Sequence, residues 1–257
     1  MRLPRPVMRA AARVKPLVPR SALPVLATLR SMVGDGPLIG TPSFRRVLVL
    51  GAHPDDETAG CGGLMALLAR SGAEVHVVSA TAGEATIGAA SSPEATGKRR
   101  TEELTRACAT LGARPPRVLG HPDGGLSDVV DALATDIRSV LAELTPEAVL
   151  LPWFLDGHRD HQAVVRAVQQ AGVAPTTELW GYETWTPLPA NRLVDISDVL
   201  GVKEAALAAH AAAHETFDVS SILGLNRYRA GYGHLPSTAA EAYLAAPAAE
   251  WFALMPR

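Results

Sequence analysis

Short apolar strands that alternate with helices constrain this chain more than any other feature of its sequence. Val47–Leu50 is a continuous apolar run, and leucines at helical spacing follow it at Leu64, Leu67 and Leu68. We expect strands at 47–50, 74–79, 118–119, 148–152 and 179–182, and helices at 97–112, 127–144 and 160–171. Apolar strands separated by helices are typical of a parallel sheet covered on both faces. The sequence therefore predicts an α/β fold.

Both ends of the chain depart from this alternation. Seven prolines interrupt residues 1–44, which leaves room for a short helix at 25–33, and the first 46 residues carry nine Lys or Arg but one Asp. We interpret 1–44 as a basic, proline-rich arm and 45–257 as one domain. A secretory signal is the alternative for the arm, but its apolar run is short and contains Pro24. The tail is expected to be helical over 200–216 and 238–246, with loops between.

Composition excludes several classes of protein. Hydrophobic residues make up 47% and charged residues 19% of the chain, as in ordinary globular domains. No apolar run approaches the ~18 residues of an integral membrane segment, and the acidic body argues against nucleic acid as a partner. The two cysteines form no disulfide framework, which favours a cytoplasmic location. The basic arm leaves weak peripheral association with membranes open, and the sequence does not indicate an oligomeric state.

One histidine and three carboxylates crowd into the turn after the first expected strand, in Gly51-Ala-His-Pro-Asp-Asp-Glu57. Capping explains an acidic residue there, but not two adjacent Asp beside a His. A dinucleotide loop does not fit, because the G-x-G-x-x-G spacing is absent. A divalent metal turns the repulsion among carboxylates into attraction. His53 and Asp56 can converge on one ion and leave Asp55 free to handle a proton.

A second cluster, His158-Arg-Asp-His161, follows the strand that ends at Pro152. Because parallel strands end at the same edge of a sheet, we expect the two clusters to meet there. Three protein ligands and an open position are what a hydrolytic metal site needs.

Taken together, these motifs resemble the PIG-L/LmbE-like de-N-acetylases, over roughly residues 45–245. The resemblance rests on Ala52-His-Pro-Asp-Asp-Glu57, Gly60-Cys-Gly-Gly63, Arg100-x-x-Glu103-Leu104, Pro122-Asp-Gly124 and His158-x-Asp160-His161. It implies a Rossmann-like, mostly parallel sheet with helices on both faces and a metal site at the carboxyl ends of the strands. It also implies hydrolysis of an N-acetyl group on a small-molecule amino sugar or glycoconjugate, which gives acetate and a free amine.

The resemblance also implies a role for each motif residue. The implied metal ligands are His53, Asp56 and His161, with Asp55 as the general base that takes a proton from the attacking water. Zn²⁺ suits two His and one Asp, and ligand type does not exclude Fe²⁺ or another divalent transition metal.

Four further positions take roles from the same resemblance. A protonated His158 would stabilise the oxyanion, and Asp160 would orient its neighbouring histidine. Arg100 and Asp123 would contact sugar hydroxyls, although an Arg100–Glu103 pair and an ordinary Asp–Gly turn are the structural alternatives.

Other residues leave alternatives open. Thiol-pathway sugar deacetylases carry a tyrosine two residues before the position of His158, where this chain has Asp156. His210 and His214 lie four apart and are expected on a structural helix face. Four aromatic residues near strand ends would either stack on sugar or pack in the core: Trp153, Trp180, Tyr182 and Trp185.

Two other functions compete with the deacetylase. Two His and one carboxylate are also the ligands of non-haem Fe(II) oxygenases, although such sites usually lie on antiparallel barrels. A non-catalytic sugar-binding protein on the same fold is the second alternative.

Overall fold

The structure is a computed structural model that describes residues 37–86, 92–214, 218–232 and 237–255. Pro37–Arg257 form one compact unit. The helix expected at 25–33 lies outside the described residues. Within these residues, no helix has both the length and the apolar character that crossing a membrane requires.

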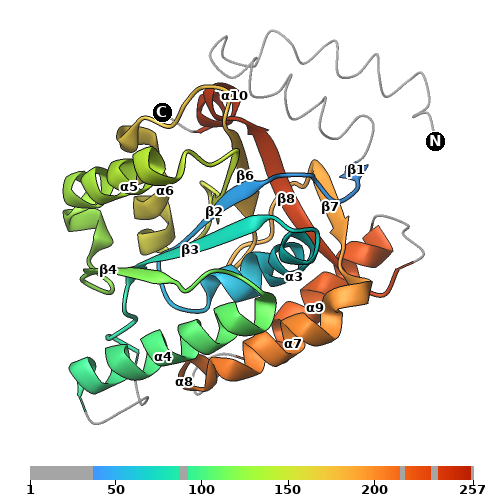
Figure 1. The fold of residues 1–257 in the computed structure, drawn as a ribbon, viewed down its shortest axis with the longest axis horizontal. Coiled ribbons are helices and arrows are strands. Elements are labelled where there is room, and N and C mark those ends of the chain that lie inside the picture. The colour runs from blue at the N-terminus through green and yellow to red at the C-terminus, as the bar shows by residue number, and fades with distance from the viewer. Residues whose placement is uncertain (1–36, 87–91, 215–217, 233–236, 256–257) are drawn as a thin grey trace, which may run out of the picture. The chain divides into compact units, whose positions relative to one another are not determined.

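One eight-stranded sheet runs through this unit in the order β1-β7-β8-β6-β5-β2-β3-β4 (Figure 1). The strands are β1 (Leu38–Ile39), β2 (Arg46–Gly51), β3 (Glu74–Thr81), β4 (Arg117–His121), β5 (Ala148–Pro152), β6 (Glu178–Tyr182), β7 (Arg192–Asp195) and β8 (Ala240–Pro247). Every pair of neighbours is parallel except those that include β8, which is antiparallel to β6 and β7. The predicted α/β fold with a mostly parallel sheet is confirmed.

Helices cover both faces of the sheet, as Figure 1 shows. They are α3 (Asp56–Arg70), α4 (Pro93–Leu111), α5 (Val130–Leu144), α6 (Arg159–Ala171), α7 (Leu200–Ala209), α8 (Ala211–His214), α9 (Val219–Tyr232) and α10 (Ala248–Ala253), with 3₁₀ turns η3 (Leu126–Asp128) and η4 (Ser197–Val199). One apolar core lies between the sheet and α3, α4 and α7, and the other lies under α5, α6 and α10.

The apolar run in β2 explains why both faces are covered. Val47 and Val49 pack into the core under α3, whereas Leu48 and Leu50 pack into the core under α5 and α6. Successive side chains of a strand point to opposite faces, so a run without polar residues needs cover on both.

The tail contains the one expected helix that is wrong. Residues 240–247 form strand β8 and not the helix predicted over 238–246. β8 is hydrogen-bonded on both sides, by β6 and β7, and its first six residues are buried. Alanine has the highest intrinsic helix propensity, but propensity contributes less than tertiary context, and two ladders of backbone hydrogen bonds outweigh it here.

Smaller differences affect three helices. The helix expected over 200–216 stops at Ala209, and His210 has non-helical backbone angles before the short α8. The loop expected after it contains α9. α4 begins at Pro93, four residues earlier than predicted, because the Ser92 side chain accepts the N–H of Ala95 and caps the helix.

Candidate metal centre

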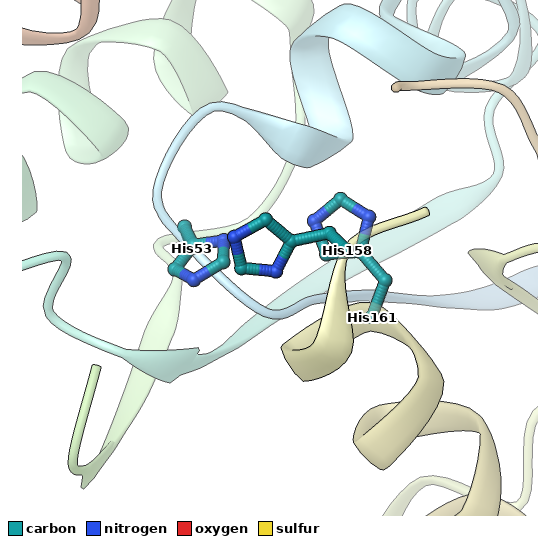
Figure 2. Close-up of side chains that lie close together, drawn as sticks. All are labelled: His53, His158 and His161. Carbon is teal, nitrogen blue, oxygen red and sulfur yellow. The ribbon is translucent and has the colours of Figure 1, made fainter. Parts of the chain in front are cut away.

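The two motifs meet at one edge of the sheet. β2 and β5 are neighbouring parallel strands, so the loop after β2 and the segment before α6 leave the sheet at the same edge. Figure 2 shows the rings of His53, His158 and His161 grouped there. One nitrogen of each lies within 4.8 Å of the other two. The fold therefore brings both motifs into one site.

The carboxylate of Asp56 lies between two of these histidines. Its Oδ2 accepts the N–H groups of Ala52 and His53, each at 2.9 Å, and lies 3.6 Å from Nδ1 of His53. Its Oδ1 lies 3.2 Å from Nε2 of His161. Burial alone would raise the pKa of Asp56, but the neighbouring His161 and His53 hold it well below its usual value. Asp56 is thus an ionised, fixed ligand candidate.

His161 shows whether these side chains fit a metal ion. Its Nε2 is buried and has no hydrogen-bond partner in the described part of the chain, although Asp56 Oδ1 is close. Its Nδ1 lies 3.0 Å from Oδ1 of Asp156. A metal-ligating histidine usually gives its second nitrogen to a carboxylate in this way. The unpartnered nitrogen beside an ionised carboxylate fits a divalent cation.

His53 is supported in the same way. Its Nε2 lies 3.1 Å from Oδ1 of Asp123 and 3.3 Å from Oδ2 of Asp160, on the ring edge away from Asp56. His53, Asp123 and Asp160 also form a possible ligand group of their own. Asp160 was expected to orient its neighbouring histidine, but its carboxylate contacts His53 and accepts the N–H of Gly124. Asp123 is therefore more than a turn residue, and both carboxylates fix the ring of His53.

His158 faces the same space from the start of α6. Its ring centroid lies 4.8 Å from those of His53 and His161. Burial and the charges of those two histidines lower the pKa of His158, which favours the neutral ring and not the protonated one expected for oxyanion stabilisation. Because its Nδ1 accepts the N–H of Asp160, the proton of the neutral ring belongs on Nε2. His158 can therefore donate without being charged.

Asp55 and Arg100 form an ion pair beside the histidines. Nη2 of Arg100 lies 3.1 Å from Oδ2 of Asp55 and donates to the carbonyl of Pro54 at 2.6 Å. Burial raises the pKa of Asp55 to about 6, against the opposing effect of Arg100. The alternative pairing of Arg100 with Glu103 is not formed, since the Glu103 carboxylate accepts from Arg99. Arg100 thus orients Asp55.

A cavity of about 260 Å³ opens onto these groups. Its polar wall consists of His53, Asp55, Asp56, Arg100, Asp123 and His158. Its other wall includes the uncharged side chains of Ala59, Thr184, Trp185, Ala213 and Ile222. A converging set of histidines and carboxylates at one wall of a cavity is suited to hydrolysis with a metal.

Comparison with known proteins identifies the domain that carries both motifs and the polar wall of this cavity. The sequence profile of the family described as "PIG-L: GlcNAc-PI de-N-acetylase" matches residues 48–172, which contain both motifs. The chain contains a PIG-L family domain. The resemblance expected from the sequence is confirmed.

Relatives of the PIG-L domain have been named for their activities. The chain is 38% identical, over 152 residues, to the 1D-myo-inositol 2-acetamido-2-deoxy-alpha-D-glucopyranoside deacetylase of Mycobacterium sp. (strain KMS). That match covers 54% of this chain and 48% of the relative, so the chain spans about half the length of the curated relatives that it matches first.

Solved structures share the fold. The conserved protein TT1542 from Thermus thermophilus has a TM-score of 0.65 and 29% identity, over 77% of this chain and 93% of its own. The N,N'-diacetylchitobiose deacetylase from Pyrococcus horikoshii has a TM-score of 0.71 over 97% of this chain and 96% of its own. Its identity is 19%, so it supports the fold alone.

Asp156 is the residue of the PIG-L domain whose importance the sequence did not show. It stands where the expected tyrosine is missing, and its side chain is fully buried. Oδ1 contacts His161 and accepts the N–H of His158, while Oδ2 accepts the Thr184 hydroxyl. The one sequence signal was an acidic residue two positions before the second histidine motif, next to a strand end.

Glu57 contacts the backbone at Asp55 and His210 contacts Glu57, and the sequence did not predict either contact. Oε2 of Glu57 accepts the N–H of Asp55 at 3.1 Å, and Asp55 has a φ of 139°, which is strained for a residue with a side chain. Nε2 of His210 lies 3.2 Å from Oε1 of Glu57. His210 is thus a buried partner of the motif and not a residue of a plain helix face. The side chain of His214 lies outside the described part.

The four aromatic residues have different roles. Trp153, Trp180 and Tyr182 are at most 5% exposed and belong to the packed interior. Trp185 is 66% exposed and lines the cavity.

Proposed function

We propose that the PIG-L domain is a metal-dependent N-deacetylase that hydrolyses the acetamide of an amino-sugar substrate to acetate and a free amine. One observation carries this proposal. The buried Nε2 of His161 makes no hydrogen bond within the described residues and lies 3.2 Å from Oδ1 of Asp56, while Asp55, next in sequence to Asp56, pairs with Arg100. His53 and Asp56, two of the candidate ligands, line the same cavity wall as Asp55, whose pKa is raised, and the buried His161 contacts Asp56.

We infer that His53, Asp56 and His161 hold the metal. The set of two imidazoles and one carboxylate fits Zn²⁺, and Fe²⁺ or another divalent transition metal also suits these donors. When bound, such an ion supplies Lewis acidity toward the amide carbonyl and lowers the pKa of water. Asp156 and the Asp123–Asp160 pair hold the outer nitrogens of the two imidazoles.

Asp55 is the general base of the proposed reaction. Its carboxylate lines the cavity and takes a proton from the attacking water, then returns it to the nitrogen of the departing amine. Arg100 fixes the position of Oδ2, and Glu57 fixes the strained backbone. Both contacts hold the carboxylate of Asp55 next to the position that the scissile amide would occupy in the cavity.

His158 stabilises the oxyanion. Its neutral ring donates from Nε2, because Nδ1 already accepts a backbone N–H. A single donor of this kind contributes about 3–4 kcal/mol to lowering the barrier. The carboxylate of Asp160 contacts His53, and the lowered pKa of His158 suits a donor that stays neutral.

The substrate is an N-acetylated amino sugar or a glycoconjugate of one. This follows from the named activity of the mycobacterial relative together with the polar cavity wall. We also infer that Arg100 and Asp123 contact sugar hydroxyls with the donor and acceptor capacity that their protein contacts leave. Cys61 and Cys108 are free, buried thiols, which supports a cytoplasmic enzyme.

Neither competing function is favoured. An Fe(II) oxygenase and a non-catalytic sugar-binding protein would use the same cavity, but the curated relative is named as a deacetylase.

Amine release tests the proposal. The Zn²⁺-loaded protein is incubated with a panel of N-acetylated amino sugars, with and without a chelator, and the primary amine product is quantified. The expected result is amine release that the chelator abolishes and that added Zn²⁺ restores. Absence of release across the panel, or release that the chelator leaves unchanged, overturns the proposal. The Asp131→Asn variant, in which an exposed residue of α5 is changed, is expected to release amine as the parent does and serves as the matched control for other Asp→Asn variants in this assay.

A further inference from the structure

The backbone of Asp55 adopts a conformation that a side chain disfavours. At the N-cap of α3, Asp55 has φ 139° and ψ −26°. Residues other than glycine persist in this region only where the surrounding structure compensates for the cost. The N–H of Asp55 donates to Oε2 of Glu57 at 3.1 Å, and its carbonyl accepts the N–H of Ala59 at 2.9 Å. The Glu57 carboxylate thus supplies part of that compensation.

The carboxylate of Glu57 in turn depends on a histidine from a distant part of the chain. Glu57 is 1% exposed, so its oxygens need partners inside the protein. Oε1 accepts the hydroxyl of Thr58 and lies 3.2 Å from Nε2 of His210. Because the hydroxyl hydrogen of Thr58 is used on Glu57, its oxygen, 3.1 Å from the same Nε2, acts as an acceptor toward His210. Nε2 of His210 therefore carries a hydrogen, which points at both residues.

The break between α7 and α8 places the ring of His210. This residue has φ −86° and ψ 50°, outside the helical region, and its N–H donates to the carbonyl of Leu207. The carboxylate of Glu103 in α4 accepts the N–H of Ala212 at 3.1 and 3.2 Å, which holds the start of α8. The His210 side chain is 2% exposed. A buried donor held from both sides can keep the Glu57 carboxylate in one orientation.

The direction of the Asp55 carboxylate depends on this backbone. Nη2 of Arg100 lies 3.1 Å from Oδ2 of Asp55 and fixes that oxygen. The rotation about the N–Cα bond of Asp55 sets the direction in which the side chain leaves the backbone, and the bond to Glu57 holds that rotation. A displacement of a catalytic group by about 1 Å can cost about 100-fold in rate. A small relaxation at Asp55 would therefore lower turnover.

We propose that His210 is a positioning residue for the general base: by donating to Glu57, it keeps the backbone of Asp55 in its strained conformation and the Asp55 carboxylate directed into the cavity. This inference rests on the proposed function for the role of Asp55 as the base. His210 acts from behind the cavity wall, so its loss removes no metal ligand and no substrate contact. The loss therefore lowers kcat and leaves KM and Zn²⁺ affinity near those of the parent.

Two substitutions of His210 separate its hydrogen bond from the volume of its ring. His210→Gln keeps an N–H donor near the position of Nε2, whereas His210→Leu fills a similar space without a donor. In the Zn²⁺-loaded protein, with the panel substrate that releases most amine, His210→Leu is expected to lower kcat about tenfold. This is less than the loss of about 100-fold for Asp55→Asn, because the base is displaced and not removed. His210→Gln is expected to restore most of the turnover.

His76→Leu is the matched control. It makes the same substitution at a partly buried histidine of β3 whose Nε2 lies 3.9 Å from Glu74, and it is expected to match the parent in kcat. A loss in His76→Leu equal to that in His210→Leu would contradict a specific role for His210.

A double-mutant cycle distinguishes positioning from a general loss of structure. If His210 acts through Asp55, His210→Leu is expected to change kcat by less than about twofold in the Asp55→Asn background. The positioning role is wrong if the losses of the two single variants multiply in the double variant. It is also wrong if His210→Leu loses bound Zn²⁺, which is quantified in the same preparations.

Hydrogen exchange at the amide of Asp55 tests the inference without turnover. This N–H is bonded to Glu57, so its exchange rate in the Zn²⁺-loaded protein reports on that bond. NMR is expected to show exchange about tenfold faster in His210→Leu and close to that of the parent in His210→Gln. Faster exchange in His210→Leu, when the parent releases no amine, refutes the proposed function alone. Turnover by the parent with unchanged exchange in His210→Leu refutes the positioning role.

Discussion

Asp156 and His161 form a fully buried pair in which Oδ1 of the carboxylate lies 3.0 Å from Nδ1 of the imidazole. This contact turns Nε2 of His161 toward Oδ1 of Asp56, 3.2 Å away. The other carboxylate oxygen of Asp156 holds the loop that carries Trp185. One residue therefore sets both the geometry of a proposed metal ligand and the rim of the cavity.

The Asp156→Asn variant is expected to bind Zn²⁺ about 10- to 100-fold more weakly, because an amide holds and polarises the His161 ring less than a carboxylate does. Competition with a chromophoric chelator measures the affinity, and Asp131→Asn provides the matched control. Affinity within twofold of the parent would show that the pair does not support the metal.

The Asp55→Asn variant is expected to retain Zn²⁺ but to lose amide hydrolysis by about 100-fold or more, the scale of a missing general base. Amine release and metal content are measured on the same preparation. Turnover equal to that of the parent would remove Asp55 from the role of base.

Metal binding is expected to release a proton at pH 7.5. Burial lowers the pKa of His161, but Asp56 and Asp156 outweigh burial and raise it to about 9, so the metal-free ring is protonated at this pH. A histidine must lose this proton before it can bind the metal, so the affinity rises as the pH approaches 9. Calorimetry in buffers with different ionisation enthalpies counts the protons. A count of zero would contradict the protonated ring.

The Lys203→Met variant is expected to lose about 3–5 kcal/mol of stability, since it strands the charge of Glu241 in the interior. Nζ of Lys203 lies 2.7 Å from Oε1 of Glu241, and both side chains are at most 1% exposed. Glu241 also accepts the N–H of Gly63, just after the break in α3 at Cys61. Denaturant unfolding measures the loss.

A matched control for that variant is Arg45→Met. Arg45 pairs with Glu147 at 3.2 Å, but its side chain is 94% exposed, so the expected loss of stability is much smaller than that of Lys203→Met. Equal losses in the two variants would mean that burial of the ion pair does not determine its contribution.

The sequence predicted those parts of the fold that depend on local patterns. The apolar run of β2 and the leucines of α3 show their periods directly, and both elements formed where expected. β8 was predicted as a helix because its alanine-rich sequence has no strong period, and its state depends on pairing with β6 and β7. Such pairing joins segments that are far apart in sequence.

In the candidate site, too, the sequence predicted what local motifs determine and missed what long-range contacts determine. His53, Asp56 and His161 lie in two compact motifs, and topology alone placed the motifs at one edge. The carboxylates behind them depend on exact distances across the fold, such as Asp123 on His53 or His210 on Glu57. Spacing in the sequence carries no signal for contacts over 70 or 153 residues.

Titration of metal-free protein with Zn²⁺, with metal content and amine release followed in the same samples, tests the central claim most directly. We predict that amide hydrolysis rises in proportion to bound metal, and that His161→Ala neither binds the metal tightly nor hydrolyses the substrate. Full hydrolysis by protein without detectable divalent metal would contradict the claim.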